Sequence, residues 1–214
     1  MKSLLLTTLI LLTINGLVYS QNSIGEAEAK DFREWRDKEF CNPQTSPLLP
    51  KDFVKFEKLN YFAFDETYRI KANFVKTSEV KSFLMPTSTG TSRKYLKIGV
   101  LNFKLNDKEF SLIAFTREYP PDHPKAKEEI SDFFVPFRDL SNGEETYSAG
   151  RYVYLKVPKA GTEVIINFNL AYNPACAYGD ESFVCSIPPK ENFLQVAIRA
   201  GEKKFVSPSE KTTQ

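Results

Sequence analysis

The sequence predicts a mainly β protein, an antiparallel barrel or sandwich of about seven to eight strands with an N-terminal amphipathic helix. Three observations support this fold class. Short segments alternate apolar and polar residues with a period of two, as strands with one buried face do. Clusters of Gly, Asn, Asp and Pro separate them at hairpin spacing. The chain is rich in aromatic residues that suit packed sheets, with 18 Phe and 10 Tyr but one Trp.

Residues 26–40 form the predicted helix, because apolar side chains recur along one stripe and charged residues fill the other positions. The helix should end before Pro43, since the residue that precedes a proline disfavours helical angles. One or two helical turns are expected between Phe53 and Leu59. The helix is expected to dock on the sheet through its stripe, whose members are Ala29, Phe32, Trp35 and Phe40.

Strands are expected wherever the period-two pattern or a short apolar run occurs between turn residues. Asn106-Asp107 is the expected turn of a central hairpin, and residues 158–161 form the turn of another. Residues 117–131 are charged and rich in proline, which predicts a long connection. The predicted strands cover residues 68–74, 80–85, 95–105, 110–115, 133–137, 152–157, 164–168 and 193–198.

The N-terminus has the order of a secretory signal peptide: Lys2, an apolar run from Leu4 to Val18, and then Ser20 at a signal-peptidase position. The run is shorter than the roughly 20 apolar residues of a membrane-spanning helix, although a retained N-terminal anchor is the alternative. No other long apolar run exists, so the mature chain is expected to have no transmembrane span and to be periplasmic or secreted. The predicted organisation is a signal peptide over residues 1–20, a single β-rich domain over 21–206 and a flexible tail over 207–214.

Charge and composition argue against several classes of function. The 29 basic and 27 acidic residues are interspersed, which gives no electrostatic footprint for nucleic acid. Three cysteines and one histidine do not readily supply a zinc site, so no metal site is predicted and no cofactor is identified. A histidine-based mechanism would need His123, which lies among prolines and is better interpreted as a solvated loop residue.

Cys176 and Cys185 are nine positions apart, and in an exported chain such a pair most simply forms a disulfide. Closing so short a loop contributes about 2–3 kcal/mol by restricting the unfolded chain. A redox pair is the alternative, but the spacing is not the Cys-x-x-Cys that lowers a thiol pKa. Cys41 is left over, either as a buried free thiol or as a residue that pairs between chains.

Several segments contain polar residues that strand packing alone does not require. Arg151 enters a strand beside Tyr147, where its fork of donors suits a carboxylate or a phosphate. The alternative is a structural pair between Arg151 and Asp139 under the turn. The loop over residues 87–91 offers hydroxyls to an anion, or is simply an exposed loop.

Asn169, Tyr172 and Asn173 form a second polar cluster, in which amides either bind a polar ligand or tie down a loop. Glu191 and Asn192 precede the last predicted strand. Glu191 is a candidate general base, while ordinary turn and capping roles are the alternative for this pair. No Gly-rich phosphate loop, Gly-x-Ser-x-Gly elbow or His-Glu-x-x-His motif is present.

Two runs are distinctive: Asn-Leu-Ala-Tyr-Asn-Pro-Ala-Cys-Ala-Tyr at residues 169–178, and Cys-Ser-Ile-Pro-Pro-Lys-Glu-Asn-Phe at residues 185–193. With Phe-Val-Pro-Phe-Arg-Asp at residues 134–139 and the segment 145–152, they resemble the bacterial domain-of-unknown-function family 1684. The likeness extends over most of the expected mature chain. The resemblance implies no catalytic residue, because no activity or ligand is established for that family. Ser148-Ala149 departs from the family's glycines there.

The leading hypothesis is a module that binds a small polar or anionic ligand, because polar residues gather at strand ends, where barrels open. One alternative is an enzyme, either a hydrolase with Glu191 or Asp139 as its base or a flavin-dependent oxidoreductase of the split-barrel type. Another is a structural or interaction protein of the cell envelope. The expected ligand-binding residues are Asp139, Tyr147, Arg151, Asn169, Tyr172, Asn173, Glu191 and Asn192.

Overall fold

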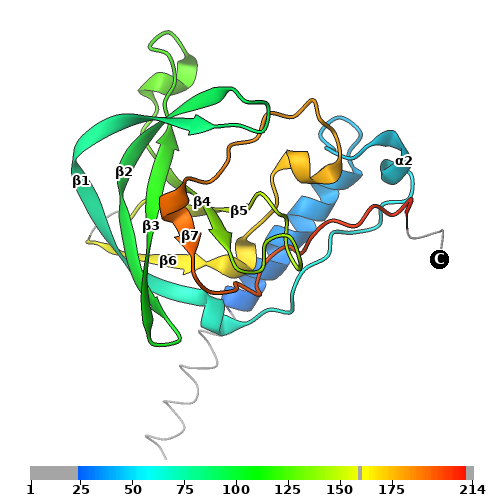
Figure 1. The fold of residues 1–214 in the computed structure, drawn as a ribbon, viewed down its shortest axis with the longest axis horizontal. Helices are drawn as coiled ribbons and strands as arrows, with labels where there is room; N and C mark the ends of the chain where they lie inside the picture. Colours follow the sequence, from blue (N-terminus) through cyan, green and yellow to red (C-terminus); the bar gives the residue numbers. More distant parts are fainter. Residues whose placement is uncertain (1–23, 159–160, 211–214) are drawn as a thin grey trace, which may run out of the picture.

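The computed structural model describes residues 24–158 and 161–210. The predicted signal peptide lies outside the described residues. The described chain is mainly β, and Figure 1 shows a sheet that curls into a barrel beside an N-terminal helix. The strands are β1 (Arg69–Pro86), β2 (Ser92–Leu105), β3 (Lys108–Arg117), β4 (Asp132–Asp139), β5 (Arg151–Lys156), β6 (Glu163–Asn167) and β7 (Phe193–Leu194).

The helices are short apart from the first, which covers residues 24–41 and confirms the predicted N-terminal helix. No helix in the described part of the chain has the length and apolar character needed to cross a membrane. The others are α2 (Pro50–Phe53) and the 3₁₀ helices η1 (Glu66–Tyr68), η2 (Pro124–Lys127), η3 (Phe168–Leu170), η4 (Ala175–Tyr178) and η5 (Lys190–Asn192).

The sheet has the strand order β5-β4-β3-β2-β1-β6, with every neighbouring pair antiparallel, and β7 adds to β4 in parallel. Because the sheet curls, β5 also comes close to β6 and the barrel is nearly closed. Of the two predicted architectures, the structure is therefore the barrel. Closing a sheet in this way removes most of the exposed edge that invites aggregation.

β1 is one long strand where the sequence predicts two, over residues 68–74 and 80–85. Its pairing with β2 shifts register between Lys76 and Lys81, a bulge that bends the strand without ending it. The first half pairs with both β2 and β6, whereas the second half pairs with β2 alone. The predicted turn between β2 and β3 is confirmed, and Asn106 and Asp107 adopt φ of 50° and 60°, as a type I′ hairpin turn requires.

The last strand is shorter than the predicted 193–198, because β7 ends at Leu194. The residues that follow give their backbone groups to other partners. The amide of Leu140 donates to the carbonyl of Val196 (3.1 Å), and the amide of Ile198 donates to the carboxylate of Asp139 (3.1 Å). Residues 195–198 are therefore held by hydrogen bonds to a side chain and to a turn rather than by pairing with a neighbouring strand.

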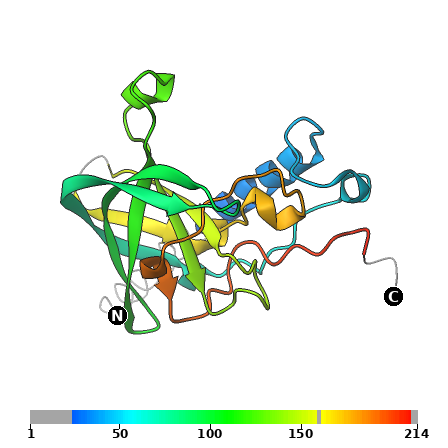
Figure 2. The ribbon, with the colours of Figure 1, turned by 45° about the horizontal axis from the view of Figure 1, so that its top comes forward.

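Two apolar layers lie on opposite faces of the sheet. The barrel interior contains fully buried aliphatic residues such as Leu101, Leu112 and Val153. The outer face of β1 to β5 contains a mainly aromatic cluster: Met85, Tyr95, Ile113, Phe115, Phe134 and Tyr152. A sheet with both faces apolar needs cover on both sides. The helix and the loop over residues 173–186 lie on the outer side, as Figure 2 shows.

The N-terminal helix docks through a stripe that differs from the predicted one by one position. Ala29 and Phe40 are buried, as expected, but Trp35 is 53% exposed. Arg36 occupies the inward position instead, with its guanidinium 4.8 Å from the ring centroids of both Phe40 and Tyr172. Residues 29, 36 and 40 follow the helical repeat, whereas position 35 points about 100° away from position 36.

The start of the predicted C-terminal tail is held in place. The Ser209 amide and the hydroxyl of Ser207 both donate to the buried carboxylate of Asp52 in α2, the former at 3.1 Å.

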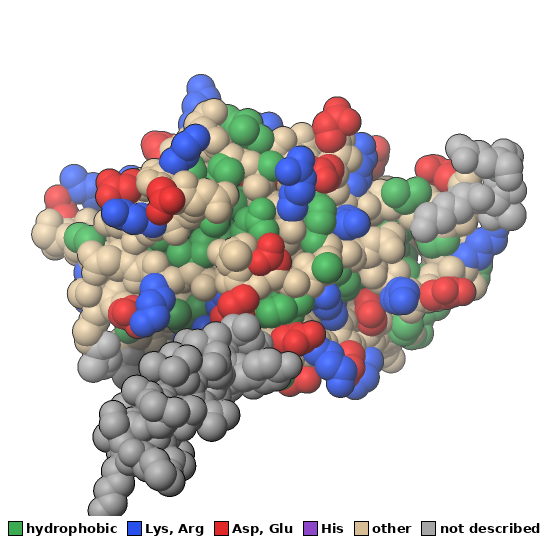
Figure 3. Space-filling model, turned by 90° about the horizontal axis from the view of Figure 1, so that it is seen from below, with side chains coloured by type: hydrophobic (Ala, Val, Ile, Leu, Met, Phe, Trp, Pro, Cys, Tyr) green, Lys and Arg blue, Asp and Glu red, His purple; other side chains and the backbone are tan. Residues whose placement is uncertain are grey.

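On the face drawn in Figure 3, acidic and basic side chains are interspersed, so that face carries no patch of one sign.

Candidate functional site

Arg151 and Asp139 form a buried ion pair, with 3.0 Å between Nη2 and Oδ2 and no exposed side-chain surface on either partner. Arg151 also donates to the carbonyls of Ile198 (2.7 Å) and Ala200 (2.5 Å). Burial lowers the pKa of Arg151, and the charge of Asp139 opposes that shift. The structure thus matches the structural interpretation of this pair, in which Arg151 fastens the C-terminal segment to the barrel.

Asn169 and Asn192 are also fully buried, and each fastens separate segments. The amide nitrogen of Asn169 donates to the Asp65 carbonyl (2.9 Å), and its oxygen accepts from the Asp65 amide (3.0 Å). Asn192 accepts from the Ile113 amide (2.7 Å) and donates to the Pro136 carbonyl (2.7 Å). Complete pairing of buried amides is what a scaffold role requires. Neither residue lines the groove described below.

Two other predicted residues stand apart from these. Glu191 is exposed at η5, and Tyr147 is partly buried, which raises the pKa of its phenol. Neither lines the large groove described below. The loop over residues 87–91 bonds internally, with Thr87 buried and its hydroxyl 2.7 Å from that of Thr91. The predicted site residues therefore do not meet in one hollow.

A groove of about 1100 Å³ lies on the outer face of the barrel. One wall is the outer face of β2 to β5, and the other is formed by the N-terminal helix and the loop over residues 173–186. The connection between β3 and β4 projects at its rim. Tyr172 and Asn173 are the two predicted ligand-binding residues that line it.

Aromatic rings form the floor of this groove. Tyr95 stacks on Phe134 with 5.2 Å between ring centroids, and Tyr154 lies 5.3 Å from Phe134. Tyr154 also stacks on Tyr172 at 6.4 Å, with 12° between the ring planes. Burial raises the pKa of Tyr154 to about 12 and raises that of Tyr172 as well, so these two phenols carry no charge at neutral pH. Tyr154 is the most open of these rings, with 52% of its surface exposed.

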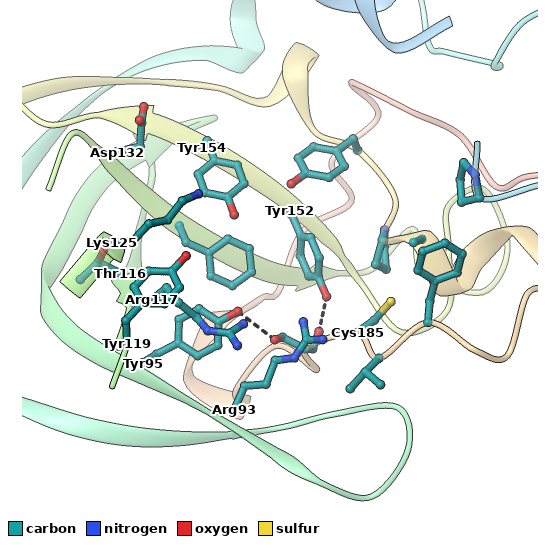
Figure 4. A pocket seen from close by; sticks show the side chains of 18 of the residues that line it. Arg93, Tyr95, Thr116, Arg117, Tyr119, Lys125, Asp132, Tyr152, Tyr154 and Cys185 are labelled. Atoms are coloured by element: carbon teal, nitrogen blue, oxygen red, sulfur yellow. Dashed lines mark hydrogen bonds between the residues drawn. The ribbon is translucent and has the colours of Figure 1, made fainter. Parts of the chain in front are cut away.

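The loop wall is fixed to the floor by hydrogen bonds and is closed on itself by a disulfide. The Tyr152 hydroxyl donates to the carbonyl of Ser186 (2.5 Å), and the Tyr95 hydroxyl lies 3.0 Å from the Ser186 hydroxyl, as the dashed lines in Figure 4 show. The predicted disulfide between Cys176 and Cys185 is present. Cys41 is an exposed free cysteine, which removes the interpretation of it as a buried thiol.

Basic side chains border the floor. Figure 4 shows Arg93 and Arg117 reaching into the groove beside Tyr95, with Lys125 nearby. The guanidinium carbon of Arg117 lies 5.7 Å from the ring centroid of Tyr95 and 5.8 Å from that of Tyr119. Sequence reasoning missed these cations, because each looks like an ordinary charged residue on the wet face of a strand or in a loop.

A buried polar network closes the inner end of the groove around Glu202. Its carboxylate accepts from the Tyr178 hydroxyl, from Arg36 Nη2 (3.3 Å) and from the Asn173 side chain (3.0 Å). Burial raises the pKa of Glu202, and Arg36 opposes that shift. Two atoms here, Arg36 Nε and Asn173 Oδ1, have no hydrogen-bond partner within the described residues. No sequence signal marks Glu202, because it stands beside Lys203 and Lys204 in a segment that resembles charged surface.

The carboxylates and the histidine considered for catalysis do not line the groove. No group of three or more His, Cys, Asp or Glu residues within the described ranges is arranged to hold a metal ion. Asp139 and Glu191, the carboxylates considered as general bases, both lie outside the groove. His123 stacks on Tyr119 at 4.4 Å, and its Nδ1 accepts from the Lys125 amide (3.1 Å). The histidine therefore acts as the N-cap of η2.

Comparison with known proteins assigns this chain to a family. The family model described as "Protein of unknown function (DUF1684)" matches residues 54–203. A solution NMR structure of an uncharacterized protein from Haloarcula marismortui is similar, with a TM-score of 0.67 and 32% sequence identity over 86% of this chain and 96% of that one. No curated protein matches the chain. The family match includes the barrel and the loop wall but not the helix that completes the groove.

Proposed function

The chain belongs to DUF1684, a family of proteins of unknown function. From that premise we propose that it is an exported domain. We propose further that it binds a small polar or anionic ligand in the tyrosine-lined groove. The observation that carries this proposal is a groove of about 1100 Å³ whose floor combines stacked aromatic rings with basic side chains at the edge. Ligand pockets typically combine an apolar or aromatic lining with a few convergent polar groups, in volumes of about 300–1,000 Å³.

The construction of the walls supports the same function. The floor belongs to a nearly closed barrel, and the facing loop is fastened to it at Ser186 and closed by the disulfide. A site held by rigid elements loses little conformational entropy when a ligand binds. The helix contributes Arg36 at the inner end, held between rings and Glu202. The groove is therefore preorganised.

Export is supported by the charged start and the short apolar run of the first 20 residues, and by the disulfide, which persists in oxidising compartments. Expression of the full chain in a bacterial host checks this directly. We expect the product in the periplasm or medium, with Gln21 as its first residue by N-terminal sequencing. Recovery of an uncleaved chain in the cytoplasm would contradict the export part of the proposal.

The binding function is tested by ligand-observed NMR with a library of small polar and ionic fragments against the purified protein. Hits should lose affinity in Tyr154→Ala, which removes the most open ring of the floor, while its melting temperature stays within a few degrees of the original. Tyr147→Ala is the matched control, because Tyr147 is partly exposed but lies outside the groove. If no fragment binds, or if both variants behave alike, the groove is not a ligand site.

A further inference from the structure

We propose that the groove selects a ligand in which an oxyanion is joined to a planar ring, with the oxyanion held between Arg93 and Arg117 and the ring lying on the floor at Tyr154. This inference rests on the proposed binding function and specifies the chemical class of its ligand. It follows from the register of β2 and β3, from the charges around the two arginines and from the position of the open ring.

The sheet register places both guanidinium groups on the face that forms the groove. Tyr95 of β2 pairs directly with Arg117 of β3, so their side chains lie on the same face. Arg93 precedes Tyr95 by two residues on β2, and side chains two apart on a strand also share a face. All three residues line the groove. The two cations are thus brought to one side of one hairpin.

Neither arginine is paired with an acid in the described part of the chain. In residues 24–158 and 161–210, Arg93 and Arg117 form no ion pair. Two of the acids that line the groove belong to the sheet or to its edge. Asp132 pairs with Lys156 (2.7 Å), and the Glu118 carboxylate accepts from the neutral Ser82 hydroxyl (2.5 Å) rather than from either arginine.

The other acids that line the groove come from elements other than this hairpin: Glu39 from the helix, and Glu128 and Glu129 from the connection after η2. Two like charges on one face repel each other, and an oxyanion between them would relieve that repulsion. A guanidinium presents a planar fork of donors that matches the oxygens of a phosphate or a carboxylate. Stacking against Tyr95 and Tyr119 restricts the Arg117 fork before a ligand arrives.

The ring half of the ligand follows from the floor next to the arginines. The series Tyr95, Phe134 and Tyr154 leads away from them, with neighbouring centroids 5.2 Å and 5.3 Å apart. The series ends in the half-exposed ring of Tyr154, whose face a planar group can cover. The phenol of Tyr154, whose pKa burial raises to about 12, is uncharged at neutral pH and does not repel an anion.

Calorimetric titration of the exported full-length product with four small probes tests the inference: phenyl phosphate, benzoate, inorganic phosphate and phenol. We expect the two ring-bearing anions to bind at least tenfold more tightly than phenol or inorganic phosphate, with affinity that falls as salt is added. The better of phenyl phosphate and benzoate identifies the preferred oxyanion. Arg93→Gln and Arg117→Gln should each weaken that probe about tenfold, and Arg117→Lys should recover only part of the loss.

Lys94→Gln is the matched control, because it removes one positive charge from the same strand at a side chain that does not line the groove. It should leave the affinity within twofold of the original. If phenol binds as tightly as phenyl phosphate, and the arginine variants change nothing, the oxyanion assignment is wrong while the groove remains a binding site. If none of the four probes binds but library fragments do, the ligand class is wrong. If no fragment binds either, the proposed function fails as well.

Discussion

Asp139 and Arg151 are joined by a 3.0 Å ion pair in which both side chains are completely buried. Asp139 is the last residue of β4, and Arg151 is the first residue of β5. Both side chains also form hydrogen bonds with the backbone of residues 198–200. A buried charge that loses its partner stays desolvated, which makes single substitutions at such a pair costly. The pair therefore belongs to the scaffold, and we expect its removal to change the free energy of unfolding.

Removal of either partner of this pair should lower the free energy of unfolding by about 3–5 kcal/mol. We expect this for Asp139→Asn and for Arg151→Met in urea denaturation followed by circular dichroism. The exposed pair of Arg199 and Glu145 supplies the control, and Arg199→Met should cost less than about 1 kcal/mol. Equal losses in the two experiments would show that burial of the first pair does not matter.

The side chain of Asn192 replaces part of the backbone hydrogen bonding between β3 and β4. β3 and β4 share the single registered pair of Phe115 and Phe134, and the Asn192 amide bonds to Ile113 and Pro136 on either side of the gap. Asn192→Ala should destabilise the fold by about 2–4 kcal/mol, since it leaves several buried backbone groups unpaired. It should also speed hydrogen exchange at the Ile113 amide.

Asn192→Asp separates hydrogen bonding from side-chain volume. A carboxylate has the same shape but offers no donor to the carbonyls of Ile113 and Pro136. We therefore expect it to destabilise at least as much as Asn192→Ala. Stability close to that of the original protein in either variant would contradict the bridging role.

The disulfide should contribute stability through the unfolded chain. Cys176→Ser with Cys185→Ser is expected to lower the free energy of unfolding by about 2–3 kcal/mol, because the unfolded chain regains the freedom of the closed loop. The same loss should appear when the original protein is unfolded under reducing conditions. Cys41→Ser, at the exposed free cysteine, is the control and should change neither result.

The contact between Asp52 and the C-terminal segment should make stability depend on pH. Burial by itself would raise the pKa of Asp52, but hydrogen bonds from Ser207 and Ser209 outweigh it and place the pKa below its ordinary value of 3.8. A carboxyl whose pKa is lower in the folded state adds stability above its unfolded pKa, and this contribution is lost as the pH falls through the folded pKa.

The original protein should therefore lose more stability than Asp52→Asn when the pH is lowered from 5 to below 3.8. Urea denaturation at each pH measures the difference. Glu128→Gln, an exposed acid in the connection after η2, should lose as much as the original protein. A parallel pH response in Asp52→Asn and the original would contradict a lowered pKa at Asp52.

Local chemistry explains the parts of the fold that are predictable from sequence. The period of two places strands correctly, and Asn106-Asp107 predicts its hairpin because both residues tolerate positive φ. The break between residues 74 and 80 misleads, since a bulge interrupts the alternation without ending β1. Trp35 misleads for a similar reason, because a stripe chosen by hydrophobicity alone overlooks Arg36 as the inward residue.

The candidate site shows the limit of such reasoning. Distinctive polar motifs drew attention to Arg151, Asn169 and Asn192, and these residues are fully buried and bonded within the scaffold. A buried polar group needs partners wherever it lies, so a conspicuous polar residue is as consistent with a scaffold as with a site. The groove is instead lined by Arg93 and Arg117, which no local pattern distinguishes from solvated strand residues.

The sequence by itself determines that this chain is mainly β, where its central hairpin turns, which cysteines can pair and to which family it belongs. Alternation along a strand states which side chains share a face. It does not state what covers that face, because the cover comes from residues far away in the chain. Only the tertiary structure brings the helix and the loop over residues 173–186 against β2 to β5 and leaves a groove between them.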